Sequence, residues 1–166
     1  MKIIVDAFGG DNAPLEIIKG SMLAVDEFGV DIILVGDEDK INKCVSENKI
    51  TLKNTEIVDT KGVITMTDDA KSVLKEKADS SMAVGFRLLN EGRGDAFVSA
   101  GNTGAVTVGA TLITKRIKGV KRVALASFIP GKNGNYLMLD IGANADCRPE
   151  MLYQFGIMGS VYMEKV

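Results

Sequence analysis

The sequence predicts an α/β protein whose mostly parallel sheet is covered by helices on both faces. Short apolar runs typical of buried strands alternate with longer segments whose apolar residues recur at helical spacing. Such alternation indicates βαβ units, and the glycine-containing loops that follow three of the strands suit the turns within them. A length of 166 residues fits one domain. We therefore expect residues 1–166 to form a single α/β domain.

Residues 1–60 predict three strands separated by two helices. Pro14 stands where a first helical residue would, with Asp11 or Asn12 as the cap, and Gly29 closes that helix. The expected elements are a strand over Lys2–Ala7, a helix from Pro14 to Phe28, a strand over Asp31–Val35, a charged helix over Asp37–Asn48 and a strand over Thr55–Val58.

The rest of the chain continues the alternation. We expect helices over Thr67–Lys77, Ser80–Glu91 and Ala105–Ile117, strands over Ala96–Ser99, Val123–Phe128 and Tyr136–Ile141, a turn at Gly131–Asn135, and a last helix from Pro149. The last helix reaches Val166 without a cap and looks cut rather than finished. One face of it carries Met151, Leu152, Phe155, Met158 and Tyr162.

The composition excludes several kinds of site. The chain has no histidine, which rules out Ser-His-Asp and Cys-His nucleophile pairs and His-ligated zinc within it. A net charge of −2 gives no general attraction to nucleic acid. Residues 96–114 carry no charge, but their serine, asparagine, threonine and glycine content is too polar for a membrane span. With two cysteines in no ligand or disulfide pattern, these features predict a cytoplasmic protein without a transmembrane segment.

Three predicted strands run into glycine-containing loops. The loops are Asp6–Pro14 (DAFGGDNAP), Ser99–Ala105 (SAGNTGA) and Asp140–Asp146 (DIGANAD). In a parallel sheet all three would lie at the carboxyl edge, where open α/β folds bind ligands. Glycines let backbone N–H groups approach an anion, and the serine, threonine and asparagine side chains add neutral donors. The set predicts a site for phosphate or another small oxyanion.

Other interpretations of these residues stay open. The loops could be tight βα turns, for which glycine, asparagine and aspartate are the usual residues. Asp6 and Asp140 could be metal ligands, general bases or backbone anchors; anchoring is the simplest role, because a bare carboxylate beside an anion site repels the ligand. The absence of Walker A and GxGxxG motifs disfavours a dinucleotide site with Asp37 as ribose ligand. Cys147 could accept an acyl group, but no histidine is present to activate it, and Cys44 lies in a polar helix.

Five basic residues lie within eight positions at the end of the helix predicted over Ala105–Ile117. A cluster of this kind is usually a solvated helix end, where it suits the C-terminal dipole. Docking of an acidic partner is the alternative. The five residues are Lys115, Arg116, Lys118, Lys121 and Arg122.

Four motifs resemble those of the PlsX family, the phosphate acyltransferases of bacterial phospholipid synthesis. They are VDAFGGDNAP, the tripeptide SSM at Ser80–Met82, VSAGNTGA, and LDIGAN followed by the helix YQFGIMGSVY, and they lie in the family's order along the whole chain. Family members are about twice as long, so residues 1–166 resemble the N-terminal half of such a chain. The departures are Asn12 for a usual histidine, Val123 for a usual proline, Gly156 for a usual alanine, and the divergent stretch Ala70–Lys75.

The resemblance implies a fold and a reaction. The fold would be a Rossmann-like three-layer α/β/α sandwich, similar to phosphotransacetylase and isocitrate dehydrogenase-like folds, in a homodimer. The reaction would transfer a fatty acyl group from acyl carrier protein to inorganic phosphate and give acyl phosphate, without a metal or organic cofactor. Phosphate is itself the nucleophile, so no histidine base is required. The basic cluster would then dock the acidic carrier protein, and peripheral membrane association stays open.

The loops and the resemblance together name the candidate site residues. We expect catalytic roles for Asn102, Thr103 and Asn144. We expect substrate or phosphate binding by Asp6, Gly9, Gly10, Asp11, Ser81, Ser99, Gly101, Gly104, Asp140, Gly142 and Ala143. A Rossmann-like nucleotide-binding oxidoreductase and a non-catalytic anion-binding fragment remain as alternatives. We also expect the 166-residue chain alone to be inactive or weakly active, because half of a family-type chain is absent from it.

Overall fold

The computed structural model describes residues 1–132 and 134–166. The structure is described as two compact units, Met1–Thr114 and Lys115–Val166. The first unit holds a parallel sheet with helices, and the second holds a hairpin and one helix.

The first unit is built on a four-stranded sheet in which every neighbouring pair is parallel. The strands are β1 (Lys2–Asp6), β2 (Asp31–Gly36), β3 (Thr55–Asp59) and β4 (Ala96–Val98), in the order β3-β2-β1-β4. Ile3 of β1 lies opposite Ile32 of β2 on one side and opposite Ala96 of β4 on the other. The α/β class and the parallel sheet predicted from the sequence are confirmed.

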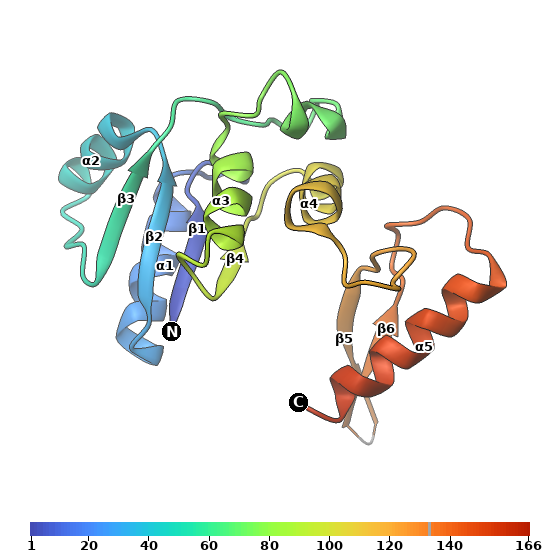
Figure 1. Ribbon diagram of the computed structural model, residues 1–166. Coiled ribbons are helices and arrows are strands. Elements are labelled where there is room, and N and C mark those ends of the chain that lie inside the picture. Colours follow the sequence, from blue (N-terminus) through green and yellow to red (C-terminus); the bar gives the residue numbers. More distant parts are fainter. Residues whose placement is uncertain (133) are drawn as a thin grey trace. The chain divides into compact units, whose positions relative to one another are not determined.

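Helices cover both faces of this sheet, which gives the three expected layers (Figure 1). The helices α1 (Leu15–Phe28) and α2 (Glu38–Glu47) pack on one face, and α3 (Ser81–Asn90) packs on the other. Because side chains alternate along a strand, Ile32 and Leu34 enter the core under α1 while Ile33 and Val35 enter the core under α3. The continuous apolar run of β2 is therefore buried on both sides.

The residues that cap the helix N-termini agree only in part with those predicted from the sequence. Asp37 accepts the N–H of Lys40 at the start of α2, and Ser80 accepts the N–H of Ala83 at the start of α3, as capping residues do. The predicted side-chain cap of α1 at Asp11 or Asn12 is wrong, because Pro14 occupies the cap position and no side chain bonds there.

Two predicted helices of the first unit differ from the structure. The segment predicted as a helix over Thr67–Lys77 contains only a short 3-10 helix, η1 (Ala70–Leu74). Asp68 accepts hydrogen bonds from the Thr65 backbone and side chain, and such local bonds compete with helix formation. The helix predicted over Ala105–Ile117 begins earlier as α4 (Thr103–Gly109) and continues as a π-helical segment, η2 (Ala110–Lys115).

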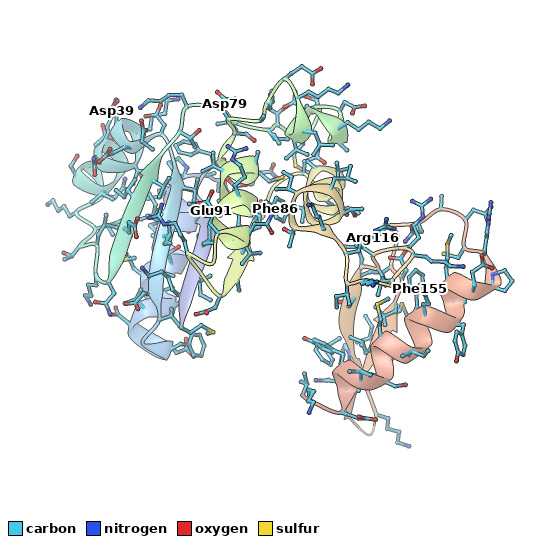
Figure 2. All side chains as sticks on the ribbon, viewed as in Figure 1. Asp39, Asp79, Phe86, Glu91, Arg116 and Phe155 are labelled. Atoms are coloured by element: carbon cyan, nitrogen blue, oxygen red, sulfur yellow. The ribbon has the colours of Figure 1, made fainter. Side chains whose placement is uncertain are left out.

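Two glycines let aromatic rings lock β4, α3 and α4 together. The rings of Phe86 and Phe97 have centroids 4.5 Å apart. A Cβ on Gly85 would lie 2.3 Å from the Phe97 ring, and a Cβ on Gly109 would lie 2.3 Å from the Phe86 ring. Figure 2 labels Phe86 where α3 faces α4. Each ring thus fills the space that a side chain at a glycine would occupy.

The second unit contains an antiparallel hairpin and a helix. The hairpin pairs β5 (Ala126–Gly131) with β6 (Gly134–Leu139), and α5 (Pro149–Met163) follows. The prediction that these strands extend the parallel sheet is wrong. Only residues 132 and 133 separate them, and a parallel pair needs a crossover of about a dozen residues or more. Position 133 of the predicted turn lies outside the described residues.

Helix α5 packs on the hairpin through a narrower face than the sequence predicts. Phe155 is 3% exposed, Gly159 lies against Leu139, and the Tyr162 ring lies 5.9 Å from that of Phe128. Several apolar side chains of α5 are exposed, namely Leu152, Tyr153, Ile157, Val161, Tyr162 and Met163. No helix in residues 1–132 or 134–166 is long and apolar enough to cross a membrane.

Candidate functional site

Two of the predicted loops meet at the carboxyl edge of the sheet. Loop 1 (residues 6–14) follows β1 and loop 2 (residues 99–105) follows β4, and these strands are parallel neighbours. A Cβ on Gly101 would lie 3.2 Å from the Cα of Gly9, so the two backbones approach closely. Gly10 has φ +112°, which favours glycine, and lies against Ala100 of loop 2. The predicted juxtaposition of these two loops is confirmed.

Asp6 lies beneath both loops and accepts hydrogen bonds at both carboxylate oxygens. Oδ1 accepts the Ser81 hydroxyl at 2.6 Å and the Phe8 N–H at 3.2 Å. Oδ2 accepts the Ser99 hydroxyl at 2.7 Å, and Ser99 Oγ in turn accepts the Gly101 N–H at 3.1 Å. Asp6 is 2% exposed. In this arrangement the hydroxyl groups of Ser81 and Ser99 each donate to one oxygen of Asp6.

Asn102 uses its side chain to build the structure around loop 2. Its Oδ1 accepts the Ala105 N–H at 3.0 Å and caps α4. Its Nδ2 lies 3.2 to 3.4 Å from three carbonyl oxygens, those of Thr65, Met66 and Asp68. The amide therefore holds the segment before η1 against the start of α4.

The sequence analysis missed that segment as part of the site. The Asp68 carboxylate pairs with the Lys77 ammonium and accepts the N–H and hydroxyl of Thr65. These contacts, the Lys77 bond foremost, lower the pKa of Asp68 to about 2. The signal was present in the run TMTDD, whose threonines and aspartates are typical of capped turns rather than helix interiors.

Thr103 and Gly104 present the donors of loop 2 that are available to a ligand. They are the first two residues of α4, and within the described part of the chain their N–H groups have no hydrogen-bond partner. Both residues are exposed. Unpaired N–H groups in a first helical turn favour an anion, and the hydroxyl of Thr103 adds a neutral donor. Among the three residues predicted to be catalytic, Thr103 alone has a side chain that is not already bonded within the described residues.

Loop 3 (residues 140–146) belongs to the second unit and is folded around Asp140. The carboxylate accepts the N–H groups of Leu125, Ala143 and Asn144 and the side-chain amide of Asn144. Burial would raise the pKa of Asp140, but these hydrogen bonds outweigh it and hold the pKa below its usual range. β6 pairs with β5 in the hairpin, so the prediction that loop 3 follows a strand of the parallel sheet is wrong. In this structure Asp140 and Asn144 anchor their own loop, and Gly142 has φ +113°.

Asp37, the residue considered for a ribose, forms part of a charge cluster beyond β2 and β3. Lys61 pairs with Asp37 at 3.0 Å, with Asp59 at 3.1 Å and with Asp39 at 3.2 Å. The hydrogen bond from Lys61 is the main cause of the lowered pKa of Asp37. With its oxygens bound to Lys61 and Lys40, Asp37 serves to join the two strand ends, which removes support for a dinucleotide site.

The basic segment (residues 115–122) begins at Lys115, the last residue of η2, and continues as a loop. Gln154 of α5 accepts the Lys121 N–H and donates to the Gly119 carbonyl, each at 2.9 Å. Lys121 Nζ lies 3.5 Å from Glu150, and the Arg116 guanidinium bonds the Lys121 carbonyl. These contacts fix the loop on α5 and leave the basic side chains at the surface.

The remaining candidates carry little chemistry. Within residues 1–132 and 134–166, no group of three or more histidine, cysteine or acidic residues is placed to hold a metal ion. Cys44 and Cys147 are both free thiols. A groove of about 290 Å³ opens between α1 and the β1–β4 pair, with Gly20 on its wall and Asp6, Ser99 and Ala100 at its carboxyl end.

The fold is that of the phosphotransacetylases. A phosphotransacetylase from Streptococcus pyogenes matches 95% of this chain and 51% of its own, with a TM-score of 0.73 and 17% identity. The EutD phosphotransacetylase of Staphylococcus aureus matches 92% of this chain and 49% of its own, with a TM-score of 0.67 and 21% identity. At these identities the likeness concerns the fold alone.

The sequence comparisons define the family. A family model described as "Fatty acid synthesis protein" matches residues 1–166, and the chain belongs to that family. Proteins named "Phosphate acyltransferase" from Thermoanaerobacterium thermosaccharolyticum, Clostridium kluyveri and Clostridioides difficile are 48%, 45% and 43% identical over the whole chain. The match covers 49%, 50% and 49% of those proteins, so the chain spans about half the length of its curated relatives.

Proposed function

We propose that this chain is part of an acyltransferase that moves a fatty acyl group from acyl carrier protein to inorganic phosphate and releases acyl phosphate. The observation that carries the proposal is the 48% identity, over the full length of the chain, with a protein named "Phosphate acyltransferase". The family description, "Fatty acid synthesis protein", supports the fatty acyl group as the cargo.

In this proposal Thr103 and Gly104 hold the phosphate. Their unpaired N–H groups and the Thr103 hydroxyl supply neutral donors, so the phosphate keeps its nucleophilic charge. Loop 1 lies against loop 2 through Gly9 and Gly10 and would close one side of the site. Asp11 is exposed and would face solvent beside the anion. Gly142 of loop 3 is a further candidate donor, whereas the N–H of Ala143 is already donated to Asp140.

The reaction needs no histidine and no acyl-enzyme. A phosphate oxygen attacks the thioester carbonyl carbon, a carbon–oxygen bond forms, and the carbonyl electrons move to an oxyanion. Collapse of this intermediate breaks the carbon–sulfur bond and releases the carrier thiolate, which takes up a proton. The protein supplies the orientation of phosphate toward the carbonyl and donors for the oxyanion. In this mechanism neither Cys44 nor Cys147 takes part in the reaction.

The basic segment is our candidate docking surface for the carrier protein. Lys118 lies in the loop that Gln154 fixes on α5, and an acidic partner would be drawn to its charge. Charge reversal by Lys118→Glu should lower the association rate with the acyl carrier protein, with an effect that shrinks in salt. Lys49→Glu, an exposed change in the first unit, is the matched control. An equal loss with a small acyl thioester would contradict docking.

The complete enzyme is proposed to act in the cytoplasm as a homodimer that includes the half its relatives carry beyond this match. The free thiols support a reducing compartment. The exposed apolar side chains of α5 support a covering partner.

The decisive experiment measures acyl phosphate formation from acyl carrier protein thioester and phosphate. The assay is run with the 166-residue chain and with a form extended to the length of the relatives, and we expect turnover in the extended form. Phosphate titration of the 166-residue chain, followed by amide NMR, should move the Thr103 and Gly104 signals first. Absence of acyl phosphate from the extended form would overturn the proposed activity. Binding of NADH in a fluorescence titration would favour the oxidoreductase alternative.

A further inference from the structure

The unusual feature of loop 2 is that a buried carboxylate determines its hydrogen bonding. Asp6 ends β1, which lies between β2 and β4 in the sheet. A buried carboxylate is costly unless its oxygens accept hydrogen bonds. Here three donors from three segments satisfy it, namely the Ser81 hydroxyl at the start of α3, the Ser99 hydroxyl after β4 and the Phe8 N–H of loop 1.

The carboxylate also fixes the direction of each hydrogen bond. A carboxylate can only accept, so the hydroxyl protons of Ser81 and Ser99 both point at Asp6. The Ser99 oxygen then has lone pairs left, and it accepts the Gly101 N–H at 3.1 Å. A directed chain results, from the Gly101 N–H through Ser99 to Asp6. It sets the peptide that lies two residues before the open N–H of Thr103.

Gly9 of loop 1 covers this chain of hydrogen bonds with its backbone alone. A Cβ on Gly9 would lie 2.6 Å from Asp6 Oδ2, 2.7 Å from Ser99 Oγ and 2.9 Å from the Gly101 nitrogen. The Gly9 backbone is therefore in contact with all three members of the chain. The side chains of Asp6 and Ser99 are covered on this side. Within the described residues, the hydroxyl protons of Ser81 and Ser99 are both donated to Asp6.

We propose that Asp6 is a positioning residue for the phosphate loop and not itself a phosphate or metal ligand. It acts on Thr103 and Gly104 through Ser99 and the Gly101 N–H. Ser81 fastens the other carboxylate oxygen to α3. This inference rests on the proposed function for the identity of the anion, and it assigns different work to three residues expected from the sequence to bind phosphate.

The test compares Asp6→Asn with a matched aspartate in the extended, active form. An asparagine is the same size but brings an N–H donor, so one of the two serine hydroxyls must turn to accept it. We expect KM for phosphate to rise about tenfold or more, the range for loss of a charge-assisted bond, with kcat and KM for the acyl donor changed much less. Asp95→Asn is the control, because Asp95 accepts the Lys2 N–H at 2.7 Å at the opposite ends of the same strand pair.

A double-variant cycle separates positioning from a general loss of structure. If Asp6 acts through Ser99, then Asp6→Asn combined with Ser99→Ala should raise KM for phosphate no further than Asp6→Asn alone. Ser99→Ala by itself should reproduce most of the rise, which keeps the test available if Asp6→Asn does not fold. Multiplicative effects of the two changes, or a fall in kcat with an unchanged KM for phosphate, would overturn the proposal.

Phosphate binding by the 166-residue chain tests the same point without catalysis. The shifts of the Thr103 and Gly104 amides on adding inorganic phosphate should be lost in Ser99→Ala and kept in Asp95→Asn. Shifts kept in Ser99→Ala would refute the positioning role. If wild-type chain shows these shifts while the extended form makes no acyl phosphate, the proposed function fails and the role of Asp6 in anion binding stands.

Discussion

Two glycine-to-alanine substitutions in the first unit should change stability in opposite directions. Gly9→Ala places a methyl carbon within 3 Å of Asp6 Oδ2, Ser99 Oγ and the Gly101 nitrogen. None of these atoms can retreat without breaking a hydrogen bond of the Asp6 chain, so we expect the cost of overpacking, about 1–3 kcal/mol. Gly20→Ala adds the same carbon in the interior of α1, where nothing lies within 4 Å. Higher helix propensity should stabilise that variant by about 0.5–1 kcal/mol.

The two effects together separate the variants by about 1.5–4 kcal/mol, which urea unfolding followed by far-UV circular dichroism can measure. With a slope of about 1–3 kcal/mol per molar, the midpoints should differ by on the order of 1 M, with wild type between them. Peptides from β1 and β4 should lose protection against amide hydrogen exchange in Gly9→Ala but not in Gly20→Ala. A Gly9→Ala midpoint equal to that of wild type would refute the close packing of loops 1 and 2.

Three further outcomes test other parts of the molecule. Phe155→Ala removes the best buried side chain of α5 and should lower the free energy of unfolding by about 3–5 kcal/mol, whereas Tyr153→Ala, at a side chain that is 72% exposed, should change it by less than about 0.5 kcal/mol. Tyrosine fluorescence can follow the unfolding, because all three tyrosines lie in the second unit. Equal losses of stability in the two variants would contradict the packing of α5. The pKa of Asp68 is lowered to about 2 in the folded chain, so its contribution to stability is complete above its unfolded pKa of about 4 and is lost as pH falls toward 2. The difference in thermal midpoint between wild type and Asp68→Asn should therefore shrink as pH falls from about 4 to 2. A difference that grows over this range would be inconsistent with the pairing of Asp68 with Lys77. Cys147→Ala should keep acyl phosphate formation in the extended form, and an acylated Cys147 in a mass spectrum would establish covalent catalysis instead.

The parallel sheet could be predicted from the sequence because its strands are encoded locally. The apolar run of β2 between Asp31 and Gly36 suits burial on both faces. Helix α1 ends at Phe28, before Gly29, as the sequence predicts. The pattern of each hairpin strand, taken alone, is also compatible with a parallel sheet, so it does not predict the hairpin. The short connection after Gly131 carried the contrary information.

The sequence predicted that loops 1 and 2 lie together, but not which of their side chains are bonded within the protein. Glycines and small polar residues marked loops 1 and 2 correctly, since close backbone approach requires them. Sequence could not distinguish Asn102, whose amide is bonded within the protein, from Thr103, whose hydroxyl is open. That distinction depends on the fold of the segment around Asp68, which lies 34 residues away from Asn102 along the chain.

The aromatic interlock of β4, α3 and α4 constrains how this unit can change over time. The Phe97 ring occupies the volume of a side chain at Gly85, and the Phe86 ring does the same at Gly109. A larger residue at position 85 is therefore tolerated only together with a smaller one at 97, and positions 86 and 109 are bound by the same condition. These pairs should vary in concert among relatives. Because α4 runs from Thr103 to Gly109, a mismatch between positions 86 and 109 would shift the helix and displace Thr103 at its other end.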